Sequence, residues 1–298
     1  MPLSRNIGNT KKRLFRKAKI EGFRLLKSPL KGHRPDFMVI GAQKSGTSSL
    51  HYYLSQHPRL RGSLPKEIHY FDKWIHYGYD IKWYESHFKS FSRKNSLYFE
   101  SSPNYIYYEE TAKLLHEHYP GIKLILMLRD PAERAYSAWN MYRDMYMKGY
   151  PDFSKREGRH PGETNAIYRY LMKDRDAFPS FGEAIDIEME LIRKKGPAEP
   201  AILRRGFYAD QLKNYLKYFS GDQIHIIGFK DFTEHPQKVL KKVYQFLGVE
   251  AHDKVKTPVK SKGSYRSSPG AKEKTFLADL YSDKNEALFT LINKKINW

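Results

Sequence analysis

The chain has 298 residues, with 53 lysines and arginines against 33 aspartates and glutamates, which gives a formal net charge of +20 at pH 7. It contains no cysteine, which excludes disulfides, thiolate metal ligands and cysteine nucleophiles. The charge predicts attraction to polyanions such as nucleic acid, acidic glycans, anionic membranes or nucleotide cosubstrates, and charge alone does not choose among them.

Residues 1–35 are predicted to form a basic arm in front of a single domain that covers residues 36–298. Basic and apolar side chains are interleaved in the arm, which predicts either a short amphipathic helix on a membrane or partner surface, or a solvated arm. No apolar run approaches the ~20 residues of a membrane-spanning helix, and no secretory signal is recognised. We therefore expect a cytoplasmic protein, with peripheral membrane contact through residues 1–35 as one option.

Strand and helix patterns alternate along most of the chain. The strongest strand signal is 122–128, a nearly continuous apolar run of the kind that is buried on both faces of a parallel sheet. The expected strands cover 36–41, 97–100, 122–128 and 223–229, with 64–72 as a short connector or strand. The expected helices cover 50–57, 80–91, 109–119, 129–148, 180–195, 206–219, 236–247, 270–282 and 284–295. This order predicts an α/β domain with a central, mostly parallel β-sheet flanked by helices, and ligands at the carboxyl ends of its strands.

Residues 41–50 have the sequence GAQKSGTSSL and predict an anion-binding turn between a strand and a helix. The first turn of a helix leaves backbone N–H groups without partners, and the helix dipole adds positive charge there. Gly41 and Gly46 let the backbone approach a ligand, and Lys44 supplies a charge. The spacing is close to the nucleotide-binding GxxxxGK[ST] loop, but Thr47 stands where that motif has its lysine. Hydroxyl donors come from Ser45, Thr47, Ser48 and Ser49.

A second polar cluster follows the strand at 122–128. Arg129 leaves the strand at the carboxyl edge of the sheet, where its guanidinium can bind a second phosphate with two hydrogen bonds, and Ser137 lies two turns into the following helix. The alternative is an ordinary ion pair at the helix start between Arg129 and Asp130 or Glu133. Two anion sites on one sheet edge would suit a ligand that carries phosphates at both ends.

The pair GAQKSGTSSL and LRDPAERAYSAW resembles the sulfotransferases that use 3′-phosphoadenosine 5′-phosphosulfate (PAPS), in the glycan-modifying branch typified by the heparan sulfate sulfotransferases. The resemblance runs from about residue 36 to residue 298. It includes KEIHYFD at 66–72, ESSPNY at 100–105, RGFY at 205–208 and YSDKNE at 281–286. It implies transfer of a sulfuryl group from PAPS to a hydroxyl, most often of a carbohydrate, with PAP (the desulfated product) released.

The resemblance also implies which residues bind the cosubstrate. Those assigned to the 5′-phosphosulfate are Lys44, Ser45, Gly46, Thr47 and Ser48. Arg129 and Ser137 would hold the 3′-phosphate, with Tyr208 also at the cosubstrate. A late basic loop is expected to close over the cosubstrate, and its residues are Lys262, Gly263, Ser264, Tyr265 and Arg266.

Catalysis requires a base for the acceptor hydroxyl and a cation for the leaving phosphate. Glu67 matches the family's catalytic glutamate and is the candidate base, provided that burial raises its pKa. His69 is the rival, because both side chains would point the same way on an extended segment. Lys44 would stabilise the charge that develops on the leaving 5′-phosphate, and no metal is expected.

The chain departs from the heparan 3-O-type enzymes in one catalytic segment, where Ser101 follows Glu100 in place of a lysine. It also lacks their membrane anchor and disulfide, which favours a bacterial-type or non-Golgi relative and leaves the acceptor open. The other readings are a P-loop kinase-like phosphotransferase and a non-catalytic polyanion-binding protein; no nucleic acid partner is expected. The predicted acceptor cleft, a glycan site that could take acidic groups, involves Trp74, Tyr77, Trp83, Trp139, Tyr142, Arg143, Lys148, Arg156 and Arg159.

Overall fold

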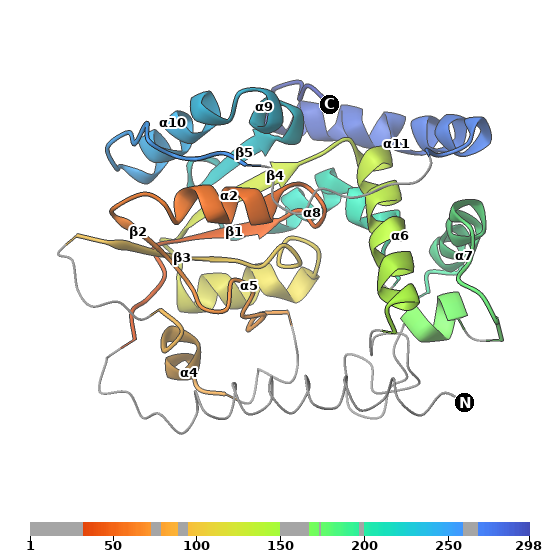
Figure 1. The fold of residues 1–298 in the computed structure, drawn as a ribbon, viewed down its shortest axis with the longest axis horizontal. Helices are drawn as coiled ribbons and strands as arrows, with labels where there is room; N and C mark the ends of the chain where they lie inside the picture. Colours follow the sequence, from red (N-terminus) through yellow and green to blue (C-terminus); the bar gives the residue numbers. More distant parts are fainter. Residues whose placement is uncertain are drawn as a thin grey trace.

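A computed structural model describes residues 32–72, 79–88, 95–149, 167–172, 174–196, 200–258 and 268–298. At its centre lies a five-stranded sheet with the order β2-β3-β1-β4-β5, in which every neighbouring pair is parallel (Figure 1). The strands are β1 Phe37–Gly41, β2 Leu60–Gly62, β3 Leu97–Ser101, β4 Lys123–Leu128 and β5 Ile224–Gly228. The predicted α/β fold with a mostly parallel sheet is therefore confirmed.

The sheet order places β1 in the middle, with β3 on one side and β4 on the other. The chain thus changes its direction of winding at β1, and open α/β sheets bind their ligands at such a switch point, beyond the carboxyl ends of the strands. In Figure 1 the arrowheads of β1 and β4 point toward the side of the molecule where α6 lies.

Helices cover both faces of the sheet and extend beyond its carboxyl edge. They are α2 Thr47–Leu54, α4 Ile81–Glu85, α5 Glu109–His118, α6 Pro131–Met147, α7 Phe181–Arg193, α8 Tyr208–Tyr215, α9 Phe229–Glu234, α10 Pro236–Leu247 and α11 Ala271–Ile292. Shorter turns are the π-helical η2 Tyr168–Met172 and the 3₁₀ turns η3 Arg204–Gly206 and η4 Gly221–Gln223.

Alternate side chains of the central strands feed two apolar clusters. Met38 and Leu126 pack with residues of α5 and α8 on one face, whereas Val39 and Ile125 pack with residues of α2 and α10 on the other. All four side chains are fully buried. Burial on both faces explains why β4 has a continuous apolar sequence rather than an alternating one.

Three local predictions were wrong. The edge strand β2 was not foreseen, because it has three residues and one buried side chain. The helix expected at 80–91 is limited to Ile81–Glu85, whereas residues 64–72 form a connector without regular structure, which was one of the two options predicted. The two helices expected at 270–282 and 284–295 are one helix, α11, because Leu277, Tyr281 and Leu288 are buried at helical spacing across the polar break.

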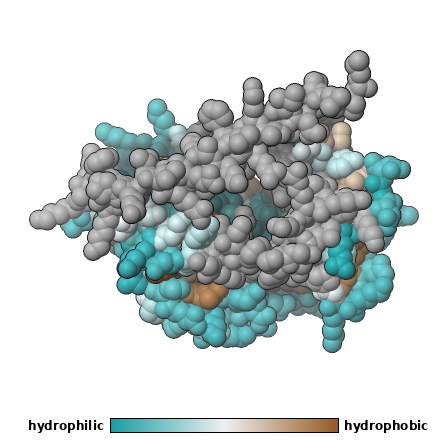
Figure 2. Space-filling model, turned by 90° about the horizontal axis from the view of Figure 1, so that it is seen from below, coloured by the Kyte–Doolittle hydropathy of each residue, from teal (hydrophilic) through white to brown (hydrophobic). Residues whose placement is uncertain are grey.

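The surface fits the charged composition of the chain. Figure 2 shows the underside of the molecule as oriented in Figure 1, where the described surface is mainly hydrophilic with small apolar patches. Among the described residues, no helix is long and apolar enough to cross a lipid bilayer.

Candidate active site

The turn between β1 and α2 has the geometry of an anion-binding loop. Gly46 is the N-cap residue of α2 with φ of 86°, and it provides no side chain to cap the helix. A Cβ atom at Gly46 would lie 3.0 Å from the ring of Phe229, so a larger residue would be crowded as well as strained. The N–H groups of the first turn of α2 are therefore open to a ligand, and Ser45 and Thr47 are buried beside them.

Positive charge is concentrated at this turn. Lys44 has φ of 70°, and the pKa of its ammonium is lowered by burial and by the nearby charges of Arg129 and Arg134. Mutual repulsion among three cations is relieved when an anion lies between them. The uncapped helix start and these cations together suit a bound anion such as a phosphate or sulfate group.

Arg129 forms the helix-start ion pair that the sequence allowed as the alternative, and its binding of a phosphate stays a prediction. Its Nε and Nη2 atoms lie 3.1 and 3.0 Å from Oε2 of Glu133, which is the helix-start ion pair. Its Nη1 atom also donates to the carbonyl oxygen of Lys44 at 3.4 Å, and its guanidinium lies 4.8 Å from the centre of the Phe229 ring. Arg129 thus joins the end of β4 to the anion-binding loop.

A cavity of about 450 Å³ lies between the first turns of α6 and the middle of α11. Of the described residues predicted to bind the cosubstrate, Arg129 lines this cavity, whereas Lys44 and Ser137 do not. Ser137 is buried on α6. The predicted closing loop, Lys262 to Arg266, lies outside the described residues, so its role stays a prediction.

Tyr208 is buried at the start of α8, and its hydroxyl donates to the carbonyl oxygen of Arg129 at 2.9 Å. Burial raises the pKa of this hydroxyl to about 12, so it stays protonated and able to donate. The structure therefore gives Tyr208 the task of holding the Arg129 backbone, and a direct contact with the cosubstrate stays a prediction.

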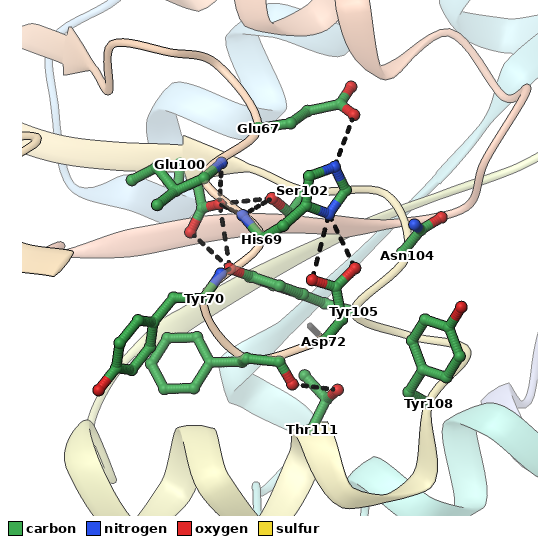
Figure 3. A network of polar contacts seen from close by, with 12 residues as sticks. Glu67, His69, Tyr70, Asp72, Glu100, Ser102, Asn104, Tyr105, Tyr108 and Thr111 are labelled. Carbon is green, nitrogen blue, oxygen red and sulfur yellow. Dashed lines mark hydrogen bonds and ion pairs between the residues drawn. The ribbon is translucent and has the colours of Figure 1, made fainter. Parts of the chain in front are cut away.

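The second half of the site is a chain of ionisable side chains on residues 66–72 (Figure 3). Nζ of Lys66 lies 2.6 Å from Oε1 of Glu67, and Oε2 of Glu67 lies 3.3 Å from Nε2 of His69. On the other side of the ring, Nδ1 of His69 lies 2.8 Å from Oδ2 of Asp72. Glu67 and His69 come together as expected, but His69 has φ of 59°, so the backbone is not an extended segment.

The expectation that burial leaves Glu67 with a raised pKa is wrong. Burial does act to raise the pKa of Glu67, but the hydrogen bond from His69 and the charge of Lys66 outweigh it and lower the pKa to about 2. Glu67 is therefore a carboxylate at any physiological pH. The sequence reasoning missed Asp72, although the spacing of three residues from His69 was visible within KEIHYFD.

Glu100 fixes the position of this segment and was not recognised as a site residue. It is fully buried at the end of β3 and accepts hydrogen bonds from the backbone N–H of Ile68 at 2.9 Å and from Tyr84 at 2.7 Å. Ser102 and Tyr105 also donate to it. Burial raises the pKa of Glu100. The sequence feature that could have identified Glu100 as a site residue is a glutamate near the end of an otherwise apolar strand.

A second buried carboxylate holds the turn that precedes α8. Glu188 on α7 accepts from the backbone N–H groups of Ile202 at 2.6 Å and Leu203 at 2.8 Å, and burial raises its pKa to about 7. This turn carries Arg205, whose Nη1 atom donates to the side chain of Asn104 at 3.0 Å. Asn104 lies near the His69–Asp72 pair in Figure 3.

Part of the predicted acceptor cleft belongs to the core instead. Trp139 and Tyr142 are buried in the apolar cluster between α6 and α7, and the indole of Trp139 donates to the carbonyl oxygen of Pro179, so neither ring is available for stacking on a sugar. Trp83 is partly buried against Tyr79. Of the remaining residues, Trp74, Tyr77, Arg156 and Arg159 lie outside the described residues.

Across the described parts of the chain, no three His, Asp or Glu side chains are arranged to hold a metal ion.

Comparison with known proteins identifies the family. The chain is 26% identical to the membrane-associated sulfotransferase kil1 of Dictyostelium discoideum, over 89% of this chain and 66% of that protein. It is 28% identical to the bifunctional heparan sulfate N-deacetylase/N-sulfotransferase 4 of Mus musculus, over 88% of this chain and 30% of that protein. The chain thus spans less than two thirds of the length of these relatives.

Among solved structures, a sulfotransferase from Alicyclobacillus acidocaldarius matches the fold with a TM-score of 0.66 at 27% identity, over 89% of this chain and 98% of that one. The sulfotransferase domain family matches residues 34–274, which is more than half of the sequence. The chain therefore belongs to the sulfotransferase domain family, whose members take their sulfuryl group from PAPS, as the two sequence motifs predicted.

Proposed function

We propose that this protein transfers the sulfuryl group of PAPS to a hydroxyl group of a carbohydrate, with Glu67 as the base and Lys44 at the leaving phosphate. The observation that carries the proposal is the placement of two half-sites at the carboxyl edge of one sheet. The uncapped start of α2 follows β1, and the Glu67–His69–Asp72 chain is held by Glu100 at the end of the neighbouring strand β3. A carbohydrate acceptor is supported by the relative named for heparan sulfate.

PAPS supplies an activated sulfuryl group, and the chain offers two sets of residues to hold it. The 5′-phosphosulfate would lie against the start of α2, with Lys44, Ser45, Thr47 and Ser48, because helix N–H groups and an ammonium favour anions. The 3′-phosphate would lie at Arg129 and Ser137, with the residues from Lys262 to Arg266 closing over the nucleotide.

The hydrogen bonds of His69 favour Glu67 as the base. Both ring nitrogens of His69 face carboxylate oxygens, Nε2 toward Glu67 and Nδ1 toward Asp72, and a doubly protonated ring would donate to both. An imidazole that donates from both nitrogens has no lone pair for a further proton. The Glu67 carboxylate is ionised and can accept the proton of an acceptor hydroxyl that enters beside it, but its pKa of about 2 makes it a weaker base than the raised pKa expected from the sequence would have given.

Lys44 would act on the opposite side of the reaction. As the bond between sulfur and the 5′-phosphate oxygen breaks, negative charge collects on that oxygen, where a fixed ammonium and a helix N-terminus stabilise it. Removal of one such preorganised group usually lowers kcat by about 10²- to 10³-fold.

The test is transfer of labelled sulfur from PAPS to a panel of glycans, with Lys44→Ala and Glu67→Gln as the site variants. Lys113→Ala is the control, because Lys113 is exposed on α5 and pairs only loosely with Glu117 at 3.8 Å. We expect label in at least one glycan, loss of transfer in both site variants, and a rise in melting temperature with PAP. Absence of label together with absence of a PAP effect would contradict the proposal.

Two further measurements separate the alternative functions. Mg²⁺-dependent phosphoryl transfer from ATP would indicate a kinase-like enzyme. Polyanion binding that weakens steeply with salt, and depends on Lys44 no more than on Lys113, would indicate a non-catalytic binder.

Membrane contact through residues 1–35 also stays a proposal, which the name of the membrane-associated relative supports, and the cytoplasmic location stays a prediction. Binding of the full chain to anionic but not to neutral vesicles is the expected result.

A further inference from the structure

We infer that Lys66 is a second catalytic cation, whose ammonium contacts the sulfuryl oxygens on the acceptor side of the reaction. This inference rests on the proposed function and adds a residue to the same site. Lys66 lies directly before the candidate base, and its Nζ atom is 2.6 Å from the Glu67 carboxylate.

The Lys66–Glu67 pair differs from the surface ion pairs of this protein. The side chains of Lys66 and Glu67 are 22% and 37% exposed, whereas those of the equally short Lys194–Glu190 pair on α7 are 71% and 62% exposed. A surface pair gains little, because water screens both charges. The charge of Lys66 is held in a partly desolvated place, where it acts more strongly on neighbouring groups.

Backbone contacts fix Lys66 beside the anion-binding helix. Its carbonyl oxygen accepts from the backbone N–H of Ser101 at 3.3 Å and from the hydroxyl of Ser63 at 3.1 Å. The hydroxyl of Ser101 in turn lies 2.9 Å from Nδ1 of His51, which is on α2. His51 comes four residues after Thr47, or roughly 6 Å along the helix from its first residue. Lys66 is therefore tied to the helix whose start is proposed to hold the phosphosulfate.

His51 itself is unsuited to the role of a cation. Burial and the charge of Lys66 lower the pKa of His51 to about 4, so its ring is neutral at pH 7. Lys66, whose ammonium lies 2.6 Å from the candidate base, is therefore the residue that we assign to this role.

The groups that the Lys66 ammonium stabilises change during the reaction. The acceptor oxygen forms a bond to sulfur, the bond from sulfur to the 5′-phosphate oxygen breaks with its electron pair moving to that oxygen, and the acceptor proton moves to Glu67. Once protonated, Glu67 is neutral and no longer balances the ammonium 2.6 Å away. The Lys66 charge is then available to the sulfuryl oxygens, while Lys44 acts at the leaving phosphate.

The experiment compares Lys66→Met, Lys66→Arg and the control Lys194→Met by two measurements. The first is kcat at pH 8.5, where the Glu67 carboxyl is ionised with or without its lysine neighbour, so that a loss of rate cannot come from protonation of the base. The second is the affinity for PAPS and for PAP by calorimetry, which reports on contact with the sulfuryl group and needs no turnover.

We expect Lys66→Met to lower kcat at pH 8.5 by about 100-fold and to weaken PAPS binding by about 10-fold, with PAP binding unchanged. Lys66→Arg, which keeps the charge, should recover most of both losses, and the control should match the wild type. A Lys66→Met enzyme with wild-type kcat at pH 8.5, or one that loses PAPS and PAP affinity equally, overturns the inference. Failure of the wild type to bind PAPS at all would instead overturn the proposed function.

Discussion

Replacement of Glu100 is the substitution that best tests how the site is held together. This carboxylate is fully buried and accepts from the backbone N–H of Ile68 and from the hydroxyls of Tyr84, Tyr105 and Ser102. Glu100→Ala would leave these donors without their acceptor inside the protein. Glu100→Gln would keep the shape and one carbonyl oxygen but would turn the other oxygen into a donor.

The two variants should differ in size of effect. Each buried donor that loses its partner costs about 1–3 kcal/mol, so the loss of an acceptor for four donors in Glu100→Ala should cost roughly 4–12 kcal/mol, a large share of the ~5–15 kcal/mol that stabilises a typical domain. In Glu100→Gln the new NH₂ group can face the tyrosine hydroxyls, which can rotate to accept, while the oxygen keeps the rigid N–H of Ile68. We therefore expect a loss of about 1–2 kcal/mol, or roughly 2–8 °C in melting temperature.

The assay is thermal unfolding together with sulfuryl transfer, and Glu85→Gln is the control. Glu85 also accepts a hydrogen bond from a tyrosine, Tyr119 at 3.2 Å, but its side chain is 21% exposed and water can replace the contact. Glu85→Gln should therefore lose less stability than Glu100→Gln and keep its activity. The reasoning is refuted if Glu100→Gln melts within 1 °C of the wild type, or if Glu100→Ala is as stable as Glu100→Gln.

Three further outcomes follow from the same geometry. Gly46→Ala should remove the PAP-dependent rise in melting temperature and destabilise the free protein by about 1–2 kcal/mol, because φ of 86° is unfavourable for alanine. Glu188 has its pKa raised to about 7 in the folded protein, so the stability that it contributes is present below pH 4.5 and is lost as the pH rises through 7. Relative to Glu188→Gln, the wild type should lose about 3 kcal/mol between pH 4.5 and pH 7.5, as measured by denaturant unfolding. With Glu67 as the base, and its pKa lowered to about 2, kcat should be flat from pH 5 to pH 8, whereas an acid limb near pH 6.5, where histidine ordinarily titrates, would assign the base to His69.

The parts of the fold that could be predicted are those in which local pattern and burial agree. The apolar run of β4 and the Gly-Lys-Ser turn before α2 are local features, since they depend on neighbouring residues and on the geometry of a helix start. The edge strand β2 exists because it pairs with β3, a non-local contact that three residues cannot reveal. The continuity of α11 likewise depends on burial of Tyr281 against distant elements.

Candidate site residues could be named from the sequence, but their arrangement could not. Glu67, His69 and Lys44 were named because their motifs are contiguous. The structure brings Glu67 and His69 into contact, and the catalytic roles of all three stay predictions. The lowered pKa of Glu67 was missed, because it results from competition between burial and two cationic neighbours whose distances the sequence does not contain. Trp139 shows the opposite error. It was predicted to stack on a sugar because it is aromatic, but it is buried in the core.

Both loops that carry site residues are held by buried carboxylates rather than by strand pairing. Glu100 binds the backbone of residue 68 in a segment without regular structure, and Glu188 binds three successive N–H groups, of residues 202 to 204, in the turn before α8. A carboxylate can accept several backbone hydrogen bonds at once. One side chain can therefore order a loop that has no backbone hydrogen bonds to a neighbouring strand. Each also carries the desolvation cost that raises its pKa. Loss of Glu100 should therefore reduce activity by displacing Glu67, and loss of Glu188 should do so by displacing the turn that leads into α8 and Tyr208, with the chemistry of the remaining side chains unchanged.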